Sequence, residues 1–182
     1  AVLVHSLSHC LMKALLFMSA GAVMHATGTK NVELLGGLAK KMPYTAAFTL
    51  VGAMSLSSLP FTSGLIGEWM ALQSFMTLGW QTGTQEMRLL VIVAFILLGL
   101  TGALALACFV RLYGIVFLGR RRSALVLKAK EMPFFMLLGM GLEALLIVLF
   151  GIFPVPLVGL MSNALSGSTL SLPLTNVWAV VW

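Results

Sequence analysis

Long runs of apolar side chains, separated by short polar connections, dominate the pattern along this chain of 182 residues. A helix needs about 20 apolar residues to cross a membrane's hydrocarbon core, which is about 30 Å thick. Runs of about this length predict five membrane-spanning helices, over residues 1–27, 43–59, 61–80, 89–118 and 133–158. Residues 161–182 hold a loop of small residues and, from Pro173, the start of a truncated sixth span. The predicted fold class is an all-α, polytopic transmembrane bundle.

The apolar stretch over residues 42–67 contains no charged side chain and is interrupted at Pro60–Gly64. Proline removes a backbone donor and clashes with the preceding turn, so this segment predicts a discontinuous helix. Two arrangements of 43–80 remain open. A single crossing would place both basic connections, 28–42 and 119–132, on one side of the membrane, as the positive-inside rule prefers. Two crossings would place them on opposite sides, and we adopt two because of a resemblance described below.

The composition indicates that lipid, and not water, is the solvent of this chain. Hydrophobic side chains make up 60% of it and charged ones 9%, with a mean hydropathy of +1.06. About a quarter of the residues of a soluble domain are charged, so a water-soluble enzyme domain is excluded. The net charge of +6 comes mostly from bases in the connections, as in cytoplasmic loops, which argues against a nucleic-acid surface. Cys10 and Cys108 lie in apolar runs, and we interpret both as buried small hydrophobic residues.

Six ionisable residues fall inside the apolar runs, where each costs about 2.5 kcal/mol or more and therefore tends to have a function. The first three are spaced i, i+4 and i+8, which places them in one polar stripe on a helix. The stripe has two interpretations. Its members either snorkel or bond to nearby backbone at a helix end, or they form a stepwise proton path of imidazoles and a desolvated lysine. The six residues are His5, His9, Lys13, Glu68, Arg111 and Glu143.

Glu68 follows the predicted helix break. The backbone groups freed by such a break, together with Thr62 and Ser63, could hold water or an ion beside a carboxylate. We therefore interpret Glu68 as a site for a proton or a cation. The alternative is an interfacial glutamate next to the anchoring residue Trp69.

Arg111 and Glu143 lie on consecutive predicted spans, about 12 and 15 Å from the connection that joins them. We expect these two side chains to form a buried ion pair, which is a structural feature at least as often as a functional one. No metal site is predicted, because His5 and His9 have no third ligand at a suitable spacing.

Four ordered motifs resemble the antiporter-like membrane subunits, a family that includes the proton-pumping subunits of respiratory complex I and Mrp-type cation/proton antiporters. Two further segments, EWMALQSF at 68–75 and ACFVRLYGIVFLG at 107–119, most resemble the large membrane subunit of hydrogenase-4 and formate hydrogenlyase. The four motifs are HSLSHCLMKALLF at 5–17, AGAVMH at 20–25, LGGLAKKMP at 35–43 and PFTSGLIGEW at 60–69.

The resemblance extends from residue 3 to about 160 and implies the second of two inverted five-helix repeats, each with a discontinuous helix. It implies that the stripe residues His5, His9 and Lys13 belong to a central hydrophilic axis and that Glu68 is the exit-side site. Arg111 occupies a position that is often basic in the hydrogenase-type members, whereas Glu143 matches no family motif. Because the first repeat is absent, we expect a C-terminal fragment or a split gene that holds at most one half-channel.

The function that this resemblance implies is proton translocation within a hydrogenase-4, formate hydrogenlyase or NADH-quinone oxidoreductase-type complex. The chain would lie in a bacterial or archaeal inner membrane, with protons or Na⁺, lipid and other membrane and peripheral subunits as partners. Redox centres would belong to those partners, since neither a catalytic residue nor a cofactor is expected here. Two alternatives stay open: a subunit of an Mrp-type cation/proton antiporter, and a scaffold whose polar residues serve only helix packing.

Overall fold

The computed structural model describes residues 1–81 and 84–166, which form helices and connections without a strand. Three helices are long and apolar enough to cross a membrane, Val2–Thr27, Gln85–Leu118 and Phe134–Ile152. The predicted all-α membrane bundle is thereby confirmed, while the predicted truncated span at 173–182 lies outside the described residues. The α-helices are α1 Val2–Thr27, α2 Pro43–Leu56, α3 Ser63–Gln81, α4 Gln85–Tyr113, continued by a π-helical turn over Gly114–Leu118, α5 Leu125–Lys128, α6 Phe134–Ile152 and α7 Pro154–Ser166.

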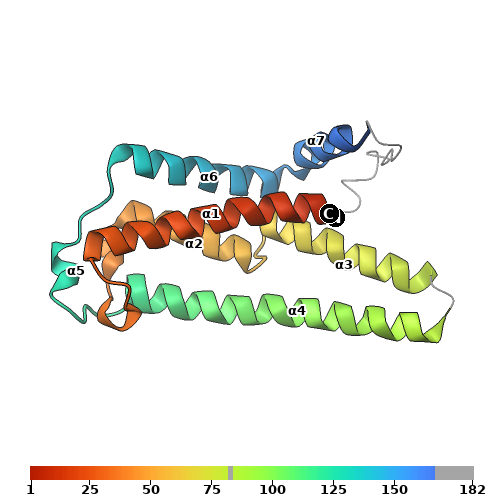
Figure 1. The fold of residues 1–182 in the computed structure, drawn as a ribbon, viewed down its shortest axis with the longest axis horizontal. Coiled ribbons are helices and arrows are strands. Elements are labelled where there is room, and N and C mark those ends of the chain that lie inside the picture. The colour runs from red at the N-terminus through yellow and green to blue at the C-terminus, as the bar shows by residue number, and fades with distance from the viewer. Residues whose placement is uncertain (82–83, 167–182) are drawn as a thin grey trace.

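The long helices lie side by side with nearly parallel axes (Figure 1). α1 packs against α2, α3 and α6, and α4 packs against α2 and α3. α1 ends where Gly28 adopts a φ of 69°, the left-handed conformation that glycine reaches without strain. α6 ends at Ile152 because Pro154 has no N–H to continue its ladder, and Pro154 begins α7 instead. The predicted run 133–158 therefore contains two helices.

α2 and α3 lie end to end and form one interrupted rod (Figure 1). Gly52 of α2 lies against Leu16 of α1, and Gly67 of α3 lies against His5 of α1. The rod therefore runs antiparallel to α1 through both of its halves. The structure differs here from the prediction, because residues 43–80 make one discontinuous rod instead of two antiparallel spans.

Residues 57–62 separate the two halves of the rod, which confirms the predicted helix break at Pro60–Gly64. Ser58 and Phe61 have φ values of 53° and 67°, and two left-handed residues change the chain direction twice. The chain therefore leaves the break in nearly the direction in which it entered. This local geometry explains why the break interrupts the crossing without reversing it.

The two basic connections meet at one end of the bundle, where α5 and the loop between α1 and α2 lie together (Figure 1). Gly36 contacts the backbone carbonyl of Arg120, and a Cβ on Gly37 would lie 2.9 Å from the carbonyl oxygen of Gly119. Glycine permits this close approach because it has no side chain. Both connections therefore lie on one side of the bundle, as the positive-inside rule favours.

The outer surface of the bundle is apolar, especially along α4, whose most hydrophobic window has no buried residue within the described structure. Such a large exposed apolar surface suits contact with lipid or with other transmembrane helices. Cys10 and Cys108 are exposed on this surface, and not buried as predicted. Their apolar neighbours face outward in a membrane protein, so an apolar run does not by itself indicate burial in the protein.

Candidate functional site

The polar stripe of α1 begins where His5 packs against Gly67 of α3. The rings of His5 and His9 stack with their centroids 6.0 Å apart. A Cβ on Gly67 of α3 would lie 2.8 Å from Nδ1 of His5, so only glycine allows this contact. Nδ1 of His5 is buried and has no hydrogen-bond partner among the described residues. The structure thus places the imidazole of His5 directly beside the residue that precedes Glu68.

Glu68 is half-buried and projects from α3 toward α4. A Cβ on Gly102 of α4 would lie 3.6 Å from Oε2 of Glu68, an ordinary van der Waals distance, so the carboxylate lies against α4 at Gly102. The imidazole of His5 therefore lies on one side of the turn of α3 that carries Glu68, and the Glu68 carboxylate projects from another side. Among the described residues no direct hydrogen bond or ion pair joins Glu68 to the stripe on α1.

Several hydroxyl groups surround the helix break. Ser57 and Ser63 are buried there, and their Oγ atoms have no hydrogen-bond partner among the described residues; the same is true of Ser8 on α1. Because α1 and α3 are antiparallel, Ser8, one turn beyond His5, is level with the first turn of α3. Buried polar atoms without protein partners are usually satisfied by ordered water. The break therefore provides a polar cluster that can hold water between His5 and Glu68.

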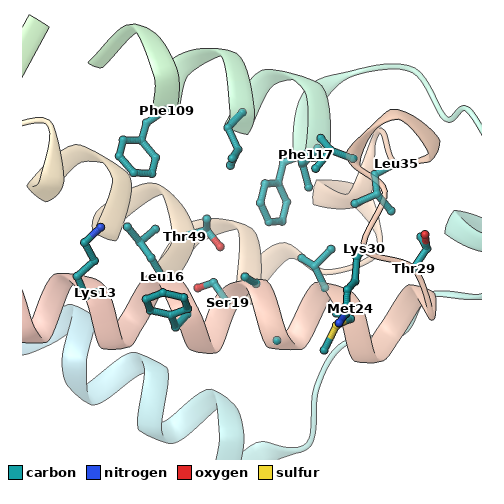
Figure 2. Close-up of a pocket in the computed structure, with 17 residues that line it drawn as sticks. Lys13, Leu16, Ser19, Met24, Thr29, Lys30, Leu35, Thr49, Phe109 and Phe117 are labelled. Carbon is teal, nitrogen blue, oxygen red and sulfur yellow. The ribbon is translucent and has the colours of Figure 1, made fainter. Parts of the chain in front are cut away.

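Lys13 lies at the far end of the stripe and lines a cavity of about 710 Å³ between α1, α2, α4 and the loop that follows α1 (Figure 2). The Ser19 hydroxyl donates to the Leu15 carbonyl oxygen at 2.8 Å, and Thr49 donates to that of Thr45 at 2.6 Å. Both hydroxyl oxygens line the cavity and keep acceptor capacity. The three predicted stripe residues thus extend from the helix break to this cavity.

Comparison with known sequences identifies the family. A sequence model of the transmembrane family of NADH:quinone oxidoreductases and Mrp antiporters matches residues 1–96, which include the whole stripe, the break and Glu68. The chain belongs to this family. The predicted resemblance is thereby confirmed.

Individual members of the NADH:quinone oxidoreductase/Mrp antiporter family match most of the chain. Hydrogenase-4 component B of Escherichia coli is 41% identical over 150 residues, covering 82% of this chain and 22% of that protein. Formate hydrogenlyase subunit 3 of Escherichia coli is 38% identical, covering 89% and 26%. Na⁺/H⁺ antiporter subunit A1 of Staphylococcus saprophyticus is 31% identical, covering 87% and 20%. The chain spans about a quarter of the length of these relatives.

The expected ion pair between Arg111 and Glu143 is absent from the part of this family member that the structure describes. Arg111 is exposed on α4 and lines a separate groove with Val32 and Cys108. Oε2 of Glu143 is buried without a hydrogen-bond partner among the described residues. The α2–α3 rod and α1 separate α4 from α6 (Figure 1). The prediction matched depths in the membrane, but equal depth does not make two helices neighbours.

Glu131 is a structural carboxylate that the sequence pattern does not mark. Its Oε2 accepts a hydrogen bond from the Tyr44 N–H at 2.9 Å, and its Oε1 accepts one from the Thr45 hydroxyl at 2.6 Å. A carboxylate at a helix N-terminus satisfies unpaired N–H groups and complements the helix dipole. Glu131 thereby fixes the start of α2, at the opposite end of α2 from the break. The one available signal was that α2 begins at Pro43 without a capping side chain of its own.

Replacing Glu131 by Ala is expected to lower the free energy of unfolding by about 2 kcal/mol, because charge-assisted hydrogen bonds to the α2 N-terminus are lost. Glu131→Gln keeps an acceptor oxygen and should lose less. The measurement is thermal unfolding of the complete membrane protein in detergent. Glu33→Ala, at an exposed position of the other basic connection, is the control and should change little. Equal stability of the Glu131 and Glu33 variants would show that the Glu131 contacts contribute nothing.

Proposed function

We propose that this chain forms one half-channel of a proton-translocating membrane subunit in a complex of the hydrogenase-4 or formate hydrogenlyase type. The observation that carries the proposal is the contact of His5 with Gly67, beside Glu68 and the break of the α2–α3 rod. This contact brings the stripe on α1 to the turn of α3 that carries Glu68. The neutral interpretation, in which the stripe residues snorkel at a helix end, does not account for an imidazole packed against a second helix.

In the proposed mechanism a proton passes from Lys13 by way of His9 and His5 to Glu68. Imidazole accepts and releases protons near neutral pH, and the stacked pair of histidines places two such groups one helical turn apart. Water held by the hydroxyls at the break would complete the step from His5 to Glu68. A positive charge on one group disfavours protonation of the next, so each transfer changes the proton affinity of its neighbours.

The proposed partners are the remaining membrane and peripheral subunits of a redox complex in a bacterial inner membrane. Support comes from the relatives, which are named as a component of hydrogenase-4 and a subunit of formate hydrogenlyase. We further propose that the redox centres lie in partner subunits and that this chain contributes ion movement.

Lys13→Ala tests the proposal, because it removes the titratable group at the cavity end of the stripe. We expect proton translocation by the complete complex to fall to near background, measured as acidification of inverted membrane vesicles during turnover. Lys40→Ala, in an exposed position outside the stripe, should leave translocation unchanged. Full translocation by Lys13→Ala would instead support a scaffold in which the stripe serves only helix packing.

A second candidate is a subunit of a monovalent cation/proton antiporter that works without redox chemistry. It is favoured by the identity of 31% to Na⁺/H⁺ antiporter subunit A1, which extends over 87% of this chain. The two candidates differ in their energy source. Na⁺ uptake driven by a pH gradient alone, in vesicles without an electron donor, would favour the antiporter.

A further inference from the structure

The cavity beside Lys13 combines an apolar wall with a basic rim. Most of its lining is apolar, including Leu16, Phe17, Leu112 and Val116. Figure 2 shows Lys13 at one end of the cavity and Lys30 with Thr29 near the other. Its rim is open, since Phe17 is 74% exposed.

The net charge of the chain is concentrated at the Lys30 end of this cavity. The two basic connections hold eight of the eleven bases and two of the five acids, which accounts for the full +6. One of those acids, Glu131, is already bound to the start of α2. No side chain of these eight bases forms an ion pair or hydrogen bond with any residue that the structure describes. The bases are Lys30, Lys40, Lys41, Arg120, Arg121, Arg122, Lys128 and Lys130.

We propose that this cavity binds an anionic phospholipid, with the headgroup phosphate at Lys30 and an acyl chain against the apolar wall toward Lys13. Charge complementarity supports an anionic headgroup, because basic pockets between transmembrane helices at the cytoplasmic surface attract anionic lipids. The apolar lining supports an acyl chain rather than a soluble anion such as free phosphate.

The length of the cavity agrees with one leaflet of a bilayer. Its lining on α1 extends from Lys13 to Met24, which is about 16 Å at the helical rise of about 1.5 Å per residue. A single leaflet contributes about 15 Å to a hydrocarbon core of about 30 Å. An acyl chain whose headgroup lies at the basic loops therefore ends near Lys13. The bound chain would keep water away from the cavity side of Lys13 and leave its approach from His9 open.

The test uses Gly21→Phe in the complete membrane complex. Gly21 lines the cavity, and a Cβ there would meet no atom within 4 Å, so the phenyl ring fills the cavity without a clash at its base. After delipidation and addition of phosphatidylglycerol, native mass spectrometry counts the lipids retained per complex. We expect one fewer phosphatidylglycerol on Gly21→Phe. Gly139→Phe is the matched control, because Gly139 on α6 is equally open but lies outside the cavity; it should retain the wild-type number.

A second pair of variants tests the headgroup. Lys30→Gln should weaken retention of phosphatidylglycerol several-fold, whereas Lys130→Gln, outside the cavity lining, should not. Retention of zwitterionic phosphatidylcholine should be the same in both. Unchanged phosphatidylglycerol counts in Gly21→Phe and Lys30→Gln would overturn the proposal and would indicate that another part of the protein fills the cavity. Lipid binding is measured without turnover, so the result is independent of the proposed proton pathway.

Discussion

Proton translocation is expected to fall to background when Glu68 is replaced by Gln in the complete complex. Glutamine has nearly the size and polarity of glutamate, so it fits in the same place beside Gly102. Its amide, however, cannot accept and release a proton as the carboxylate can. If Glu68 is the site that receives the proton from His5, the path ends there in the variant. The measurement is acidification of inverted vesicles during turnover, compared with the rate of the redox reaction in the same sample.

Glu86→Gln is the matched control for this experiment. Glu86 lies at the opposite end of α3 from Glu68, and it is exposed in the first turn of α4. The control should translocate protons at the wild-type rate. If Glu68→Gln pumps as well as Glu86→Gln does, Glu68 is an interfacial residue beside Trp69, as the alternative interpretation of the sequence holds. Loss of assembly in Glu68→Gln alone would assign the carboxylate to packing.

The helices and the break were predictable because they depend on local sequence. The length of an apolar run specifies a span. The apolar runs predicted the end of α1 and the start of α4 to within a few residues. The break was predictable from Pro60, since proline disrupts a helix wherever it lies in the interior. The stripe of His5, His9 and Lys13 required only the helical period.

The path of the chain through the break was not predictable in the same way. It depends on left-handed backbone at Ser58 and Phe61, two residue types that seldom adopt this conformation. The distribution of Lys and Arg nevertheless contained the answer, because a single crossing of 43–80 was the arrangement that placed both basic connections on one side. The resemblance favoured two crossings, and the structure agrees with the charge distribution instead.

Contacts between distant helices were the least predictable part of the site. Glu131 binds Thr45 of α2 across 86 residues of sequence, and His5 packs against Gly67, which lies far from it along the chain. Neither contact is indicated by a periodic pattern in the sequence. The pairing of Arg111 with Glu143 failed for the same reason, since depth along two helices says nothing about which helix lies between them. Lateral order in a bundle is a property of packing, and packing is decided by all the helices together.

Gly151→Ala is expected to destabilise the protein by about 1–3 kcal/mol, the usual cost of overpacking a filled interior. Gly151 is buried on α6 and lies against the backbone of the break, where a Cβ would come within 2.6 Å of the carbonyl carbon of Phe61. A backbone atom cannot rotate away as a flexible side chain can. Either α6 or the break must therefore move, and a shift of Thr62 is passed on to the start of α3 and so to Glu68.

Gly139→Ala provides the opposite expectation on the same helix. A Cβ at Gly139 would meet nothing within 4 Å, and alanine favours a helix over glycine by up to about 1 kcal/mol. The unfolding temperature of the complete protein should therefore be lower for Gly151→Ala and slightly higher for Gly139→Ala than for the wild type. Proton translocation at a temperature where both remain folded should be reduced only in Gly151→Ala, because only that variant displaces the break. Equal unfolding temperatures would mean that α6 does not press against the break, and the position of Glu68 would then not depend on this contact.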